Sequence, residues 1–299
     1  MKRREFMIGS AAAAGSFAIF QAAGKLWAQH PDRAKLDRIA IMSRSFNPIL
    51  KNINPADPSL TLEILDLPGM IAERYGVHFV EFQHTDFEST EPDYFDEFKS
   101  RLQKANSRIN QINLEFRQLN ISTPDPVLRL ETVDLTKKWV DHAATLGCAR
   151  IMVNQGTLSP EVRPFAIEAL QTINRYAKAK NVFITVENKE DGHASRTPRA
   201  HWDVDVEVIQ EAGVWSNPDV GNFPNNEARA AGLRALYPLS SGSSHCHYNP
   251  AKYSEADALK IAREVGYKGL FSIEAEAADN GPDPDVSVQT ILDEILRDM

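Results

Sequence analysis

Metal-ligating side chains stand at four spaced positions in the second half of the chain, each near the end of a short apolar run. They are Glu187, Asp219, one of the two histidines His245 and His247, and Glu274. Carboxylates buried among apolar residues cost several kcal/mol each unless a cation neutralises them. Three carboxylates and one imidazole form a hard, mostly oxygen donor set, which suits Mn²⁺, Mg²⁺ or Co²⁺ better than Zn²⁺. The pattern therefore predicts one divalent metal ion as a cofactor.

A second histidine competes for the imidazole position. The last residues of the predicted seventh strand read Ser-Ser-His-Cys-His over residues 243–247. Residues two apart lie on the same face of a strand, so His245 and His247 face the same way. The sequence leaves open which of the two is the ligand.

The elements that must bring these side chains together alternate along the chain. Short apolar runs rich in β-branched residues are separated by longer segments with helical periodicity. The predicted strands are Arg38–Met42, Val77–Phe82, Gln111–Phe116, Arg150–Val153, Val182–Glu187, Val214–Asp219, Leu239–His245 and Leu270–Glu274. Eight strand–helix units in about 270 residues predict an α/β fold, a single (β/α)8 TIM barrel over residues 30–299. The alternative is a doubly wound open sheet, but no glycine-rich phosphate-binding loop follows the first strand.

In such a barrel the active site lies at the carboxyl ends of the strands. Polar side chains near these ends could hydrogen-bond the hydroxyl groups of a substrate, and each could equally be an ordinary solvated loop residue. The candidate substrate-binding residues are Glu81, His84, Asn154, Asn188, Asn222 and His247. The same geometry places Cys148 before the fourth strand and Cys246 after the seventh, at opposite ends of the barrel. Since a disulfide needs Cα atoms within about 7 Å, both are predicted to be free thiols.

The N-terminal segment predicts export. Residues 1–29 combine Arg3-Arg4, an apolar stretch from Ile8 to Phe20 and small residues, which resembles a twin-arginine signal and implies a periplasmic protein. The apolar stretch is too short and too polar for a stable membrane anchor. The net charge is -8, and the chain without this basic segment is more acidic still. Such a surface repels phosphate backbones, so nucleic acid is not expected as a partner.

Three segments carry a family resemblance. They are Val-Glu187-Asn188-Lys, Pro218-Asp219-Val-Gly-Asn222-Phe-Pro, and the stretch from Gly266 to Glu274. They resemble the sugar phosphate isomerase/epimerase superfamily, the xylose isomerase-like TIM barrels, and in particular its exported twin-arginine members. The resemblance implies a (β/α)8 barrel with one divalent metal held by Glu187, Asp219, His245 and Glu274. The chain departs from these relatives at Lys189 and in the seventh strand, so the resemblance does not name the substrate.

A metal site flanked by two carboxylates suits proton transfer at carbon. Glu187 and Glu274 could remove a proton at one position of a sugar and return one at another, which gives isomerisation or epimerisation through a metal-bound enediolate. The same site could act as a lyase by β-elimination, if the substrate carries a leaving group. A non-catalytic sugar-binding protein is a further alternative. A multi-zinc DNA-repair endonuclease of the same barrel family is disfavoured by the negative charge. The expected partner is a small carbohydrate, and the sequence is compatible with a homo-oligomer.

Overall fold

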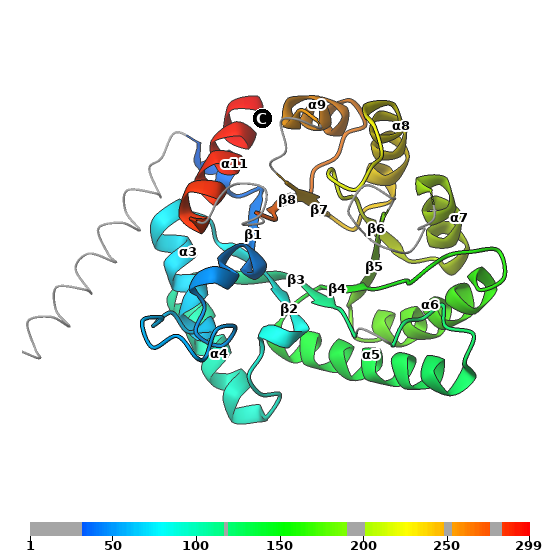
Figure 1. The fold of residues 1–299 in the computed structure, drawn as a ribbon, viewed down its shortest axis with the longest axis horizontal. Coiled ribbons are helices and arrows are strands. Elements are labelled where there is room, and N and C mark those ends of the chain that lie inside the picture. The colour runs from blue at the N-terminus through cyan, green and yellow to red at the C-terminus, as the bar shows by residue number, and fades with distance from the viewer. Residues whose placement is uncertain (1–31, 117–118, 190–200, 248–252, 276–282) are drawn as a thin grey trace, which may run out of the picture.

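A nearly closed barrel of eight parallel strands, ringed by helices, forms the single domain of this protein (Figure 1). The computed structural model describes residues 32–116, 119–189, 201–247, 253–275 and 283–299. Its strands are β1 (Ile39–Met42), β2 (Phe79–Gln83), β3 (Arg108–Leu114), β4 (Arg150–Val153), β5 (Phe183–Glu187), β6 (Trp215–Asn217), β7 (Ser243–Cys246) and β8 (Leu270–Ile273). They lie in the order β6-β5-β4-β3-β2-β1-β8-β7. The predicted (β/α)8 fold is confirmed.

Two strands begin three or more residues away from the start that the sequence pattern indicates. β3 starts at Arg108, three residues before the predicted start, because Arg108 and the polar residue Asn110 are part of the strand. The seventh strand starts later, at Ser243, because Leu239 ends a short 3-10 helix, η4 (Tyr237–Leu239). Polar residues that point into a barrel do not produce the apolar signal on which strand prediction depends.

The helices cover the outside of the barrel and bury one apolar face each. They are α2 (Arg33–Leu36), α3 (Leu67–Tyr75), α4 (Pro92–Lys104), α5 (Pro126–Leu146), α6 (Arg163–Lys178), α7 (Trp202–Ala212), α8 (Asn226–Leu236), α9 (Glu255–Glu264) and α11 (Pro284–Asp298), with further 3-10 turns η1 (Ser43–Ile49), η2 (Ile64–Asp66) and η3 (His84–Asp86). In α6 the buried residues Leu170, Ile173 and Ala177 recur at helical spacing. Helix α5 ends at Gly147, whose φ of 72° returns the chain toward β4.

β6 and β7, the two ends of the strand order, are joined by isolated backbone bridges instead of a continuous ladder. Isolated bridges join Ser216 to Ser240 and Asp219 to His245. At the second bridge, the Val220 amide donates to the His245 carbonyl at 3.1 Å and the His245 amide donates to the Pro218 carbonyl at 2.9 Å. The two strands of this joint therefore meet at the carboxyl end of the barrel.

Both cysteines are buried free thiols, as predicted. Cys148 precedes β4 and Cys246 ends β7. Within the described ranges, no helix is both long and apolar enough to cross a membrane. The export signal expected over residues 1–29 lies outside those ranges.

Candidate metal centre

Four side chains from the last four strands meet at the carboxyl end of the barrel. Glu187 is the last residue of β5, Asp219 follows β6, His245 lies in β7, and Glu274 directly follows β8. One ligand atom from each of these residues lies within 4.8 Å of the others, and all four side chains are buried. The structure thus brings together the four residues that the sequence suggests as metal ligands.

His245 stands among the three carboxylates. Its Nδ1 atom lies 2.6 Å from Glu187 Oε1, 3.2 Å from Glu274 Oε2 and 3.7 Å from Asp219 Oδ2. Its other ring nitrogen, Nε2, points the opposite way, at 2.7 Å from Glu81 Oε1. One edge of the imidazole therefore faces the carboxylate cluster, while the other edge is held from inside the barrel.

A tight turn after β6 orients Asp219. The backbone amides of Gly221 and Asn222 donate to Asp219 Oδ1 at 2.6 and 3.1 Å. The Asn222 amide side chain donates to Oδ2 at 2.9 Å. A Cβ atom at Gly221 would lie 2.8 Å from the ring of His247, so only glycine fits at this position. Asn188 holds the backbone of Asp219 from both sides, since its Oδ1 accepts from the Asp219 amide at 2.8 Å and its Nδ2 donates to the Asp219 carbonyl at 3.1 Å.

The second histidine, His247, lies at the edge of the cluster. Its Nε2 is 3.0 Å from Asp219 Oδ2 and 3.5 Å from Glu274 Oε2. Burial works against a charge on His247, yet the Asp219 and Glu274 carboxylates raise its pKa to about 10. Burial also opposes ionisation of Glu274, yet His247 and His245 lower its pKa to about 2. His247 thus forms an ion pair with the cluster, whereas His245 is the imidazole whose nitrogen faces all three carboxylates.

The donor set fits a divalent cation. Glu187, Asp219 and Glu274 are each exposed by less than a tenth, and the negative charge that they carry is not balanced by the imidazoles alone. Burial raises the pKa of Glu187 although Lys189 stands beside it, which is the cost of placing like charges together out of water. Three carboxylate oxygens and one imidazole nitrogen could hold a cation here and would remove that cost.

Apart from His247, three of the six candidate substrate contacts surround the ligands instead of lining an open cavity. Asn188 and Asn222 are hydrogen-bonded to Asp219 as described, and Glu81 is fully buried against His245. These hydrogen bonds place the three residues behind or beside the cluster, so that their polar atoms orient ligands. Contact of any of them with a substrate stays a prediction.

The remaining two candidates, Asn154 and His84, contact Glu115, which directly follows β3. Asn154 donates to Glu115 Oε2 at 2.7 Å. The Glu115 backbone amide donates to His84 Nδ1 at 3.3 Å, and the His84 ring packs edge-on against Phe116 at 4.9 Å between centroids. His84 is therefore held mainly by packing, while Asn154 belongs to a polar chain on the rim.

The sequence did not indicate that Lys189 is part of the site, although it links Glu115 to the ligand Glu187. Lys189 Nζ lies 2.9 Å from Glu115 Oε1 and 3.4 Å from Glu187 Oε2. On the other side of the cluster, Arg44 Nη1 lies 3.8 Å from Glu274 Oε1. Each of the two carboxylates expected to transfer protons thus has a cation beside it. The position of Lys189 could have indicated this role. It lies two residues after Glu187, and residues two apart on an extended segment face the same side.

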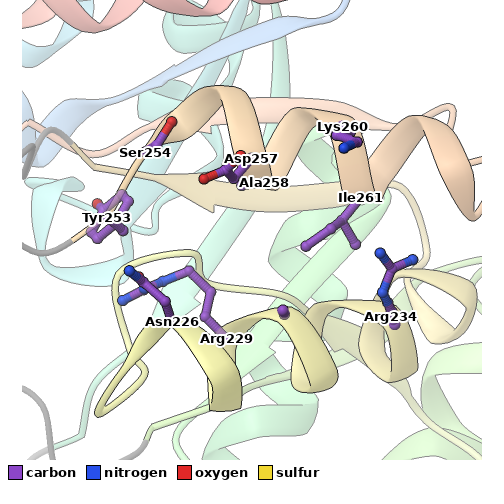
Figure 2. Close-up of a pocket in the computed structure, with 10 residues that line it drawn as sticks. Asn226, Arg229, Arg234, Tyr253, Ser254, Asp257, Ala258, Lys260 and Ile261 are labelled. Atoms are coloured by element: carbon purple, nitrogen blue, oxygen red, sulfur yellow. The ribbon is translucent and has the colours of Figure 1, made fainter.

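A surface pocket between α8 and α9 lies apart from the cluster (Figure 2). None of the four ligand residues lines it. Its wall includes Arg229, whose Nε donates to the Val220 carbonyl at 2.8 Å and whose guanidinium lies 4.5 Å from the centre of the Tyr253 ring. Arg229 is therefore engaged in holding the turn that carries Asp219.

Similarity to known proteins agrees with the barrel fold. The profile of a family described as "Xylose isomerase-like TIM barrel" matches residues 71–295. A D-allulose 3-epimerase from Methylomonas sp. superposes with a TM-score of 0.68 at 16% identity, over 88% of this chain and 98% of its own. A D-psicose 3-epimerase from Clostridium cellulolyticum H10, solved with D-tagatose, gives 0.64 at 12% identity, over 87% and 95%. A xylose isomerase domain protein from Planctomyces limnophilus gives 0.62 at 15% identity, over 87% and 96%. No curated protein sequence matches the chain.

Proposed function

This chain belongs to the xylose isomerase-like TIM barrel family, and from that premise we propose that it is an exported carbohydrate isomerase or epimerase that requires one divalent metal ion. The observation that carries the proposal is the convergence of Glu187, Asp219, His245 and Glu274 within 4.8 Å. Two carboxylates from β5 and β8 at one buried centre are the equipment needed to remove and return a proton at carbon.

A divalent cation held by these four residues would polarise the carbonyl or hydroxyl oxygen of a sugar. Glu187 turns Oε1 toward His245 and Oε2 toward Lys189, so Oε2 is the oxygen available to take a proton from carbon. Glu274, once protonated from solvent, would return a proton on the opposite face of the same carbon for epimerisation or at the neighbouring carbon for isomerisation, and Glu187 would then release its proton to solvent. Lys189 and Arg44 orient the two carboxylates from the side of the mouth.

The test combines metal analysis with a sugar screen in deuterated water. Purified protein should contain about one divalent ion per chain, and Mn²⁺, Mg²⁺ or Co²⁺ should restore activity after chelation. The screen should begin with the ketohexoses D-allulose and D-tagatose. One structural neighbour is a D-allulose 3-epimerase, and another was solved with D-tagatose. Product NMR should show one deuterium at the carbon that reacts. A sugar that loses a substituent would indicate β-elimination instead.

Two results would contradict the proposal. If the protein binds none of these metals, the convergent cluster is not a metal site. Recovery of the whole panel unlabelled, from metal-loaded protein that nevertheless binds a sugar, would indicate a binding protein.

The export part of the proposal rests on residues 1–29. Cell fractionation of the tagged full-length chain should find the mature form in the periplasm. Replacement of Arg3 and Arg4 together by lysine should retain the precursor in the cytoplasm if the twin-arginine route carries it. An unchanged distribution would argue against this route.

A further inference from the structure

A carboxylate from the opposite side of the barrel reaches the ligand cluster. Glu81 lies in β2, is fully buried, and places its Oε1 2.7 Å from Nε2 of His245 in β7. The neighbouring Nδ1 of the same ring faces the three carboxylates of the metal centre. Glu81 therefore contacts the one edge of the His245 imidazole that the cluster does not use.

The surroundings of Glu81 require it to be an acceptor. Asn113 Nδ2 and Gln111 Nε2 donate to its Oε1 at 2.8 and 3.0 Å, and Asn110 Nδ2 donates to its Oε2 at 3.2 Å. Three amide donors converge on one carboxylate, and none of these contacts offers a lone pair to a proton on Glu81.

The amides that hold Glu81 are themselves fixed. Gln111 Oε1 accepts from Thr185 Oγ1 at 3.0 Å, and Asn110 Nδ2 also donates to Ser243 Oγ at 2.9 Å. A break in strand register between Val80 and Glu81 gives β3 an extra residue opposite β2, which brings both Asn110 and Gln111 to face Glu81. This polar packing fills the inside of the barrel, where branched apolar residues are usual.

We propose that Glu81 is a positioning residue that fixes the ring and the tautomer of His245. Because Glu81 can only accept, Nε2 of His245 must carry a proton and donate it. Nδ1 is then the nitrogen whose lone pair is offered to a cation among the carboxylates. The inference rests on the proposed metal centre and deepens it, because it assigns a role to a residue outside the ligand set.

The substitution Glu81→Gln tests this role, since it keeps the shape but replaces one of the two acceptor oxygens with an NH2 donor. Where that NH2 group faces His245 it donates to Nε2, and the ring must then carry its proton on Nδ1, against the metal. Affinity for Mn²⁺, measured by calorimetry, should fall by about 10–100-fold. In Zn²⁺-loaded protein labelled with ¹⁵N-histidine, NMR of wild type should show His245 protonated at Nε2 and unprotonated at Nδ1. The variant should lose this signature.

The matched control is Asp86→Asn, which neutralises another buried carboxylate near the end of β2. Asp86 accepts from the Ser43 hydroxyl and from the Gln83 amide, and neither of these residues belongs to the cluster. The control variant should keep wild-type affinity for Mn²⁺ even if it lowers stability. Equal affinity and an unchanged His245 signature in Glu81→Gln would overturn the positioning role while leaving the metal centre intact. Wild-type protein that binds neither metal would instead contradict the metal centre itself, and the positioning role with it.

Discussion

The two halves of the barrel contribute to the same centre in different ways. Strands β5 to β8 supply Glu187, Asp219, His245 and Glu274, whose ligand atoms converge. Strands β2 and β3 supply Glu81 and the amides that hold it, and these reach the cluster only through His245. Ligands are thus concentrated in one half, while part of their orientation comes from the other. A substitution among the ligands from β5 to β8 should affect the chemistry directly. A substitution in β2 or β3 should act through metal affinity.

The largest effect is expected from the two carboxylates of the ligand half. Glu187→Gln and Glu274→Gln should each lower turnover of the sugar found in the deuterium screen by about 10²–10⁴-fold, because a general base contributes that much. Metal content must be measured with the rate. Asp219→Asn is the control that should lose metal and activity together. Normal turnover in both glutamine variants with metal bound would contradict the proton-transfer mechanism.

Metal removal should weaken the whole fold. The carboxylates of the cluster are buried, so a cation that binds only the folded state relieves their repulsion. At about 100 times its dissociation constant the metal should stabilise the protein by about 2.7 kcal/mol. For a domain of this size, the midpoint of thermal unfolding should rise by about 5–10 °C. Scanning calorimetry with EDTA and with added Mn²⁺ measures this shift, and identical midpoints would count against a metal at this position.

The residues around Asp219 should give a smaller effect. Asn222→Ala removes the side-chain donor to Asp219 Oδ2 but keeps the backbone amide that donates to Oδ1. Affinity for Mn²⁺ should fall by about tenfold, at the lower end of the range for residues that orient a ligand. Asn174→Ala, which removes a donor to the Gly213 carbonyl before β6, is a suitable comparison and should bind the metal normally. If Asn222→Ala changes only the Michaelis constant, Asn222 contacts substrate, as the sequence first suggested.

The smallest effect concerns the thiols. Burial raises the pKa of Cys148 to about 12 and that of Cys246 well above its usual value. Both should therefore resist thiol reagents in the native protein at neutral pH, whereas two thiols should react after denaturation without reductant. Detection of no thiols in the denatured protein would mean that the cysteines pair, which their separate positions before β4 and at the end of β7 do not allow.

Much of the barrel was predictable because its strands are apolar and end at marked positions. Six of the predicted strands overlap the observed ones closely. β3 begins before its predicted start because Asn110 is a polar residue inside the sheet, and β7 begins after its predicted start because Leu239 belongs to η4. The four ligand candidates were recognisable since each is a metal-type side chain at a strand end. The roles of Asn188 and Asn222 could not be predicted. The sequence alone does not distinguish a polar residue that hydrogen-bonds a metal ligand from one that hydrogen-bonds a substrate. Glu81 was assigned to the mouth for the same reason, although β2 directs it across the interior to His245.

The joint between β6 and β7 gives the metal centre a mechanical consequence. One of the two backbone bridges that close the barrel pairs Asp219 with His245, which are both candidate ligands. A cation bound by their side chains would cross-link neighbouring strands where the sheet has its sparsest backbone pairing. Opening of that joint would then require the cation to leave, and the Val220 and His245 amides, which donate across it, should exchange with solvent more slowly in loaded protein.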